Sequence, residues 1–196
     1  MTGQVTSNSG INEVNASRLT AVSSQTGNLT VFYDVALIAN EGVAEVELNG
    51  DLNNPSATPI QFEADGSSRW AGMGHYCLLS PGHTHVVELE YVGEPPFGDS
   101  YHRAFADGIA LPGFMWGCMF AFSPKGRFFV GSWMRRLFER LTLVVDCDET
   151  AYLSLPKYIS DFRVSEQGIY GMNADIGVDY RFTGRDKWVS FDEKGL

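Results

Sequence analysis

The stretch TGNLTVFYDVALI, residues Thr26 to Ile38, is the clearest β-strand pattern in this chain. Its apolar side chains recur at every second position, which places them on one face of an extended chain. They are Leu29, Val31, Tyr33, Val35 and Leu37. A polar segment, Leu19 to Ser23, precedes this strand, and a short connection containing Gly27 separates the two. Such a connection is typical of a β-hairpin, so we expect the two segments to pair.

Turn signals divide the residues that follow into units. Val43 to Leu48 alternates apolar and acidic side chains and predicts a second half-buried strand. A run rich in Asn, Gly and Pro, residues 49–59, comes next and is the best candidate for a linker. We therefore expect a flexible leader over residues 1–15, a strand pair and connecting strand over residues 16–48, this linker, and a β-sandwich domain over residues 60–196.

Short apolar segments recur between turns throughout residues 60–196. They lack the long 3.6-residue period of an amphipathic helix, and many short strands at this spacing are typical of a β-sandwich or jelly roll. The expected strands are 60–64, 70–79, 83–92, 109–122, 128–130, 141–146, 152–155, 162–164, 176–182 and 188–191. The sequence therefore predicts an all-β fold, an antiparallel β-sandwich or jelly roll.

One segment departs from the strand pattern. SWMRRLFER, residues 132–140, begins with a possible N-cap at Ser132 and places Trp133, Leu137 and Arg140 at helical spacing. We expect one short helix there. The basic residues in and near this segment form the main basic cluster, and their simplest interpretation is a solvated helix face paired with nearby Asp and Glu. The alternative is an anion or glycan site that uses Arg127, Arg135 and Arg136.

The overall charge restricts the partners of this chain. Its 196 residues carry a formal net charge of -10, with only 14 Lys and Arg. Such a surface repels phosphate backbones and anionic lipids, so we expect no direct nucleic-acid binding. The longest apolar run, Ile109 to Phe122, is shorter than the roughly 20 residues of a membrane-spanning helix, so we expect no membrane span. Cys77, Cys118 and Cys147 are widely spaced and predict buried, reduced thiols.

The segment LTLVVDCDET, residues 141–150, resembles the nucleophile motif of haloacid-dehalogenase phosphatases, a strand that ends in Asp-x-Asp-x-Thr. In that family the first acid, here Asp146, attacks phosphorus, and the second, here Asp148, acts as acid and base beside Mg²⁺. The later motifs of that family need more chain than the 46 residues that follow Thr150. We therefore interpret both acids as the end of a strand followed by a turn.

The segment PGHTHVVELEY, residues 81–91, resembles the first metal motif of cupins through His83, His85 and Glu90. Imidazoles at alternate strand positions share a face and could hold Fe, Mn or Zn with a carboxylate. His102 could join them, although its setting does not match the second cupin motif. The resemblance implies a metal-dependent enzyme or a sugar-binding β-barrel as the alternative function. Ordinary turn and strand histidines are the simpler interpretation.

The remaining sequence offers little for catalysis. It contains no GxSxG, P-loop or GxGxxG motif. Scattered Ser, His and Asp residues in a β-rich chain do not indicate a catalytic triad. We therefore expect no catalytic residues and no cofactor.

The opening stretch and the segment before it resemble the last two strands of the shell domain in small icosahedral RNA-virus coat proteins, especially the tombusvirus-like ones. In those proteins a polar strand and a short Gly turn lead into a strand of the form G-x-L-x-V-x-Y-x-V-x-L. The matching positions are Gly27, Leu29, Val31, Tyr33, Val35 and Leu37. The match covers about 20 residues, and the basic arm that neutralises packaged RNA in that family is missing.

The resemblance implies that this chain is the carboxyl-terminal part of a coat protein, with the last shell strands followed by a protruding β-sandwich. Such a domain is located in the virion, forms homo-oligomers, contacts a host receptor or glycan, and has no catalytic role. A cytoplasmic location accompanies the alternative function. Trp116 and Trp188 are then the expected contacts between copies.

Overall fold

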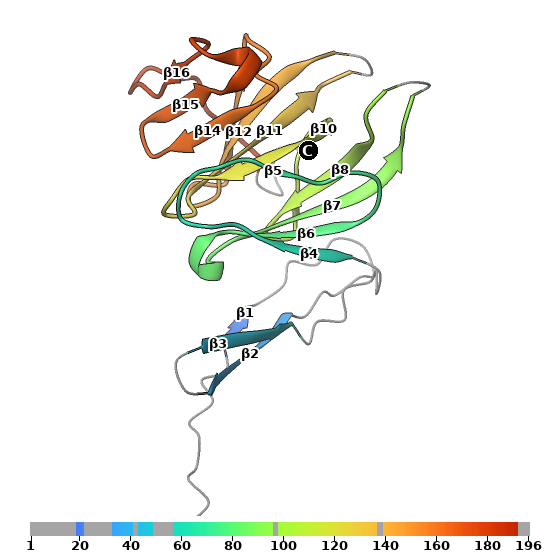
Figure 1. The fold of residues 1–196 in the computed structure, drawn as a ribbon, viewed down its shortest axis with the longest axis vertical. Coiled ribbons are helices and arrows are strands. Elements are labelled where there is room, and N and C mark those ends of the chain that lie inside the picture. Colours follow the sequence, from blue (N-terminus) through green and yellow to red (C-terminus); the bar gives the residue numbers. More distant parts are fainter. Residues whose placement is uncertain are drawn as a thin grey trace, which may run out of the picture. The chain divides into compact units, whose positions relative to one another are not determined.

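The computed structural model divides the chain into two compact units, Met1–Asn53 and Asn54–Leu196 (Figure 1). The point of division lies within the predicted linker, residues 49–59. The predicted leader, residues 1–15, lies outside the described residues. The described residues are 57–95, 98–136 and 139–191, without the side chains of 117 and 118, together with the backbone of strands 19–21, 33–40 and 43–48.

The first unit contains a three-stranded antiparallel sheet in the order β1-β2-β3. Its strands are β1 Leu19–Ala21, β2 Tyr33–Asn40 and β3 Val43–Leu48. Leu19 pairs with Val35, so the described parts of the predicted hairpin are neighbours. β3 has the predicted bounds and pairs with β2. Residues 29–32, the start of the predicted second strand, lie outside the described residues.

The second unit contains a large mixed sheet in the order β17-β13-β12-β11-β10-β8-β7-β6-β4, with β5 paired to β10 and β9 to β8. Its strands are β4 Thr58–Gln61, β5 Arg69–Trp70, β6 Tyr76–Leu79, β7 Val86–Gly93, β8 Tyr101–Ala106, β9 Ile109–Ala110, β10 Phe114–Phe122, β11 Phe128–Met134, β12 Leu141–Asp146, β13 Ala151–Leu155 and β17 Val189–Ser190. Most neighbours are consecutive in sequence, so much of the sheet is an antiparallel meander. β4 and β6 pair in parallel, and β4 begins within the predicted linker.

A smaller antiparallel sheet lies in the same unit (Figure 1). Its strands are β14 Phe162–Ser165, β15 Gly168–Gly171 and β16 Tyr180–Arg181. Two single-turn 3-10 helices, η1 Pro81–His83 and η2 Asn173–Asp175, connect strands. Within the described residues, none of the helices has the length and apolar character that a membrane crossing requires.

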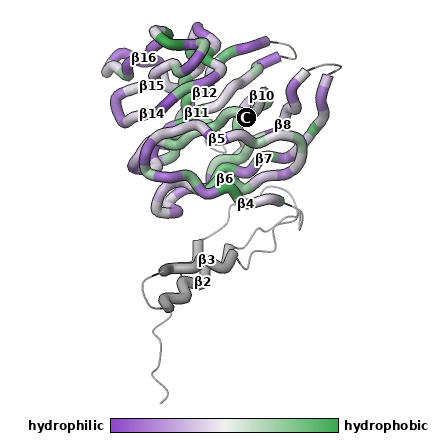
Figure 2. Tube along the Cα trace, viewed as in Figure 1, coloured by the Kyte–Doolittle hydropathy of each residue, from purple (hydrophilic) through white to green (hydrophobic). Residues whose placement is uncertain are grey.

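Strands β10, β11 and β12 carry apolar side chains on both faces because both faces are covered. On β12, Leu143 and Val145 enter a first core that also contains residues of β6, β7 and β8. Val144, between them, enters a second core with residues of the smaller sheet. All three are fully buried, and burial of each such side chain contributes about 1.5–3 kcal/mol. Figure 2 shows apolar residues along these central strands and polar residues at many of the turns. The predicted all-β sandwich is confirmed.

The predicted helix over residues 132–140 is wrong at its start. Ser132, Trp133 and Met134 are the last residues of β11, where Ser132 and Trp133 pair with β12 and Met134 with β10. Every residue of β11 is buried, so pairing on both sides and packing on both faces stabilise the extended backbone over the helical alternative. The chain then bends at residues 135–136, and residues 137–138 lie outside the described residues.

Candidate functional site

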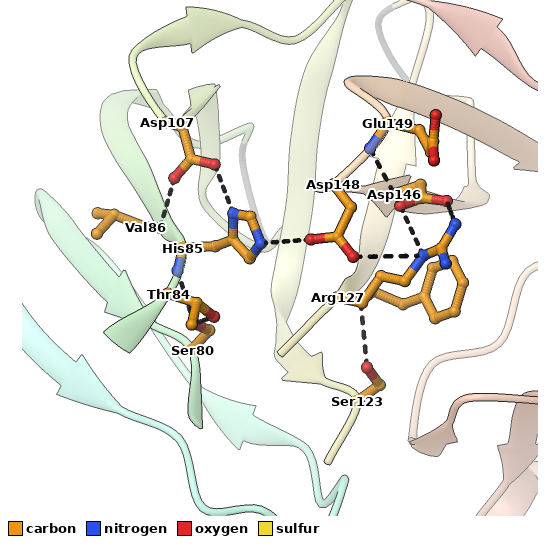
Figure 3. A network of polar contacts seen from close by, with 11 residues as sticks. Ser80, Thr84, His85, Val86, Asp107, Ser123, Arg127, Asp146, Asp148 and Glu149 are labelled. Atoms are coloured by element: carbon orange, nitrogen blue, oxygen red, sulfur yellow. Dashed lines mark hydrogen bonds and ion pairs between the residues drawn. The ribbon is translucent and has the colours of Figure 1, made fainter. Parts of the chain in front are cut away.

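Turns at one end of the large sheet place charged side chains next to one another (Figure 3). His85 immediately precedes β7, and Asp107 follows β8 at the same end, because β7 and β8 are antiparallel. Arg127 precedes β11, whereas Asp146 ends β12 and Asp148 follows it. We call these five residues the His85 network. The antiparallel register gathers them although they are far apart in sequence.

His85 lies between two carboxylates. Its Nδ1 is 2.7 Å from Oδ2 of Asp107, and its Nε2 is 3.0 Å from Oδ1 of Asp148. The imidazole side chain is 16% exposed, whereas those of Asp107 and Asp148 are 41% and 52% exposed. The second oxygen of Asp107 accepts the backbone N–H of Val86 at 2.8 Å, and the backbone N–H of His85 donates to Ser80 Oγ at 2.9 Å. The ring is therefore held from both sides.

These contacts favour the charged form of His85. The hydrogen bond to Asp107 makes the largest contribution and raises the pKa of His85 above its ordinary value. Partial burial opposes this effect, and the hydrogen bond and charge of Asp148 add to it. Both nitrogens of an imidazolium are donors, so the charged form satisfies both carboxylates. Below its raised pKa, His85 is an imidazolium between two anions.

Arg127 forms the other half of the network. Its Nε and Nη2 donate to the two oxygens of Asp146 at 3.0 and 2.6 Å, which is a bidentate pair. The side chain of Asp146 is only 7% exposed, whereas that of Arg127 is 40% exposed. The hydrogen bond to Asp146 is the main reason that the pKa of Arg127 is raised. The Nε atom also lies 3.8 Å from Asp148, which joins the two halves.

The geometry of the network suits charge pairing more than catalysis. Both imidazole nitrogens of His85 face carboxylates, so neither is open to take a proton from a nucleophile. The nearby hydroxyls of Ser80 and Thr84 lie 3.2 Å from each other, and Ser80 accepts a backbone N–H. The Asp146 carboxylate, the nucleophile of the phosphatase-like motif, is held by Arg127. The network therefore fixes four turns to one another.

The structure does not bring the four predicted metal ligands together. His85 lies in the network, whereas His102 is completely buried on β8, where its Nε2 donates to the Gly74 carbonyl at 3.1 Å. Glu90 is exposed on β7, and His83 lies in η1 with a positive φ of 55°. Within the described residues, no group of three or more His, Cys, Asp or Glu side chains is placed to hold a metal ion.

His102 instead supports residues 70–74, a segment that begins at the last residue of β5 and that we call the Trp70 loop. Ser100 Oγ donates to the Gly72 carbonyl at 3.0 Å, and Tyr76 donates to the Met73 carbonyl at 2.9 Å. Together with the bond from His102, these contacts hold three successive carbonyls. Burial lowers the pKa of His102 to about 4, so this imidazole is neutral at pH 7.

The predicted anion or glycan site is not assembled. Arg127 precedes β11 and Arg135 follows it, so their Cα atoms are separated by roughly 26 Å at about 3.3 Å per residue. Arg127 is engaged by Asp146. The Arg135 side chain pairs with Glu139 at 3.3 Å, and the same carboxylate accepts the backbone N–H of Arg136 at 3.2 Å. The Arg135–Glu139 pair agrees with the acidic partner expected in the simpler interpretation, although residues 132–134 are strand and not helix.

The two tryptophans predicted to join copies contribute to the interior. Trp116 is 3% exposed, stacks on Tyr101 at 6.4 Å between ring centroids, and lies 5.2 Å from the guanidinium of Arg140. Its burial removes it as a contact between copies. Trp188 is half-buried and stacks on Phe128 in the second core. The large apolar side chains that are exposed in the described part of the chain include Trp70, Met73, Val92, Met172, Ile176 and Val189.

Sequence patterns could not identify most of the His85 network. Asp107 lies 22 residues from its histidine partner, and Asp148 lies 63 residues from it. Asp146 and Asp148 were marked by the phosphatase-like motif, and Cys147 between them is buried with a free thiol, as is Cys77. The one local signal for Asp107 is the Asp-Gly pair it forms with Gly108, which is typical of a turn.

No family model, curated protein or solved structure matches this chain. Its function is therefore inferred from the fold and from the site.

Proposed function

We propose that this chain is a surface domain of a virus particle, a non-catalytic β-sandwich that self-associates and presents loops to a host receptor or glycan. The observation that carries the proposal is the order of its two units. The described parts of the strands that resemble the end of a coat-protein shell, β1 and β2, form a sheet with β3 within Met1–Asn53, and a β-sandwich follows within Asn54–Leu196. In the coat proteins that the opening stretch resembles, a protruding sandwich follows the shell strands in the same order.

The His85 network supports a structural role. A catalytic acid or base needs a perturbed pKa and also an atom that can reach a substrate. The perturbed group here, His85, has a carboxylate within 3.0 Å of each ring nitrogen. The most buried carboxylate, Asp146, is satisfied by a bidentate arginine. Such pairs fix the geometry of turns and leave no reacting group at the centre of the network.

The Trp70 loop supports self-association. Trp70 and Met73 are 63% and 64% exposed, although both are large and apolar. The Trp70 ring lies against the backbone of Gly72, where an added Cβ would be 2.0 Å from a ring carbon. Three buried or half-buried side chains hold the carbonyls of this loop, so it loses little conformational entropy on binding. Tryptophan is also enriched among the residues that dominate protein interfaces.

Sedimentation velocity of the full chain over a range of concentrations tests the proposal. We expect wild-type protein to form oligomers, and we expect Trp70→Ser to shift them toward monomer. The matched control is Ile176→Ser, which removes a side chain that is 77% exposed and lies outside the Trp70 loop. A chain that stays monomeric at every concentration would overturn the proposal, as would equal effects of the two variants.

Metal analysis and glycan screening of the same sample separate the alternative functions. Stoichiometric Fe, Mn or Zn that is lost in the variant His83→Ala/His85→Ala would support a metal-dependent enzyme and contradict the virion proposal. Binding to a defined glycan supports attachment when wild-type protein also forms oligomers. Glycan binding by a strictly monomeric protein would indicate a sugar-binding module instead.

A further inference from the structure

We propose that the His85 network is a pH-dependent clamp, in which loss of the His85 proton releases the β12–β13 turn, residues 148–150, while the β8–β9 turn stays attached. The basis is an asymmetry between the two carboxylates that His85 joins. Asp107 and Asp148 come from different turns and contact different ring nitrogens. They are not held equally firmly by the rest of the protein.

The Asp107 side of the clamp has three bonds. Its Oδ2 is 2.7 Å from His85 Nδ1, its Oδ1 accepts the Val86 N–H at 2.8 Å, and its own backbone N–H donates to the Val86 carbonyl at 2.8 Å. Two of these bonds do not involve the imidazole. The β8–β9 turn therefore remains attached to the start of β7 whatever the charge of His85.

The contact between His85 and Asp148 depends on the proton of the imidazolium. Asp148 contacts Nε2 at 3.0 Å, and its other charged neighbour, Arg127 Nε, is 3.8 Å away, beyond hydrogen-bond distance. A neutral imidazole has a single N–H. The shorter bond to Asp107 selects the Nδ1–H form, which leaves the lone pair of Nε2 facing the Asp148 carboxylate. The contact between Nε2 of His85 and the Asp148 carboxylate therefore changes from attractive to repulsive when His85 loses its proton.

Other charged groups lie around His85 in the same turns (Figure 3). They are the carboxylates of Asp107, Asp146, Asp148 and Glu149 and the guanidinium of Arg127. Burial, followed by the nearby carboxylates, raises the pKa of the Cys147 thiol, so this thiol stays neutral while His85 titrates. Arg127 donates two hydrogen bonds to Asp146, and its contact with Asp148 is the longer ion pair at 3.8 Å. His85 is therefore the group whose protonation the clamp depends on, because its ring joins two carboxylates and its pKa is raised above the ordinary value.

The released turn is already under strain. Thr150 has a positive φ of 48°, which costs a β-branched residue free energy unless neighbouring contacts maintain it. The Cys147 N–H donates to the Arg127 carbonyl at 2.9 Å, which anchors the start of the turn. The Thr150 carbonyl accepts the Phe191 N–H at 3.1 Å, which anchors its end. Between these anchors the Glu149 N–H donates to Asp146 Oδ1 at 3.4 Å, the longest of the three bonds, so loosening within residues 148–150 is centred on Asp148.

NMR of the full chain tests the clamp. Imidazole ¹⁵N shifts report the charge and tautomer of His85, and backbone relaxation reports order in each turn. Below the His85 pKa we expect order parameters of about 0.85 in both turns, and above it values below about 0.6 for residues 148–150 only. The neutral ring should carry its proton on Nδ1.

Asp148→Asn is the decisive variant. An amide can accept from Nε2–H or donate to the Nε2 lone pair, so this variant should hold the turn at both pH values. His83→Gln is the matched control and should keep the wild-type response. The clamp is overturned by order parameters of residues 148–150 that do not follow the His85 titration, by loosening of the β8–β9 turn instead, or by an unchanged pH response in Asp148→Asn. These outcomes are independent of self-association, so they do not test the proposed function.

Discussion

His85 and His102 lie near opposite ends of the β7–β8 hairpin and meet opposite surroundings. His85 faces two carboxylates, and the hydrogen bond to Asp107 is the main cause that raises its pKa. His102 is completely buried, and burial lowers its pKa to about 4. One residue type thus forms a charged clamp at one end and a neutral support at the other. The partner atoms and the solvent decide the role of a histidine, and its position in the sequence does not.

The two histidines make stability depend on pH in opposite directions. For His85, whose folded pKa is raised, the contribution is fully present below the unfolded value of about 6.5 and is lost as pH rises through the folded pKa. For His102, the unfolded state binds the proton more readily between about 4 and 6.5, so stability falls as pH falls through that window. Taken together, these two contributions give a maximum near pH 6.5.

The largest loss is expected from Arg127→Met. This change leaves the carboxylate of Asp146, which is only 7% exposed, without its bidentate partner. Leaving a buried carboxylate without its hydrogen-bond donors costs about 3 kcal/mol, because the charge stays desolvated. Urea denaturation at pH 7 measures the change in the free energy of unfolding.

Arg135→Met is the control for that measurement. Its side chain is 65% exposed and pairs with Glu139 on the surface, so its removal should cost less than about 0.5 kcal/mol. Equal losses in the two variants would show that the Arg127 pair is no more important than a surface contact.

A smaller loss is expected from His102→Leu. The change leaves the half-buried Gly74 carbonyl without its donor, which costs about 2 kcal/mol at neutral pH. The variant also lacks the group that binds a proton on unfolding, so the stability curve should flatten between pH 4 and about 6.5. Urea denaturation across this range checks both effects. If the free energy of unfolding of the variant falls as steeply below pH 6.5 as that of wild type, groups other than His102 cause the loss of stability in acid.

The smallest loss is expected from Asp107→Asn. The amide oxygen can still accept the Val86 N–H, so the turn is retained. The carboxylate whose hydrogen bond, together with its charge, raises the pKa of His85 is removed, and that pKa should fall. The cost below pH 6.5 is under about 1 kcal/mol, because the carboxylate is 41% exposed. An NMR titration in which the pKa of His85 stays at its wild-type value would show that Asp107 is not its main partner.

Local alternation predicted the strand Val43–Leu48 with its bounds. A continuous apolar run predicted Leu141–Asp146, a strand that is covered on both faces. The helical spacing of residues 132–140 gave a wrong prediction at Ser132–Met134, because these residues belong to a strand that is buried on both faces. Local sequence does not contain the strand pairing that decides such a case.

The site was harder to predict than the fold because it depends on register. His85 was singled out as a metal ligand, but its partners are carboxylates from two distant turns. Asp146 was marked as a possible nucleophile, and its arginine was assigned to a basic patch. The sequence indicated each of these residues by itself, but their pairing depends on the alignment of the strands, which the local sequence does not contain.

Strand β10 pairs with strands that are near to it and far from it in the sequence, and this affects the order in which the sheet forms. Its early part pairs with β8 and its later part with β5, with a register break between Met115 and Phe120. Hairpins such as β6–β7 and β11–β12 close short loops and form rapidly, whereas β5–β10 and β13–β17 join segments far apart in sequence. We therefore expect the local meanders β6–β7–β8 and β10–β11–β12–β13 to form first. We expect β5 and β17 to pair last, because their partners are far away in the sequence.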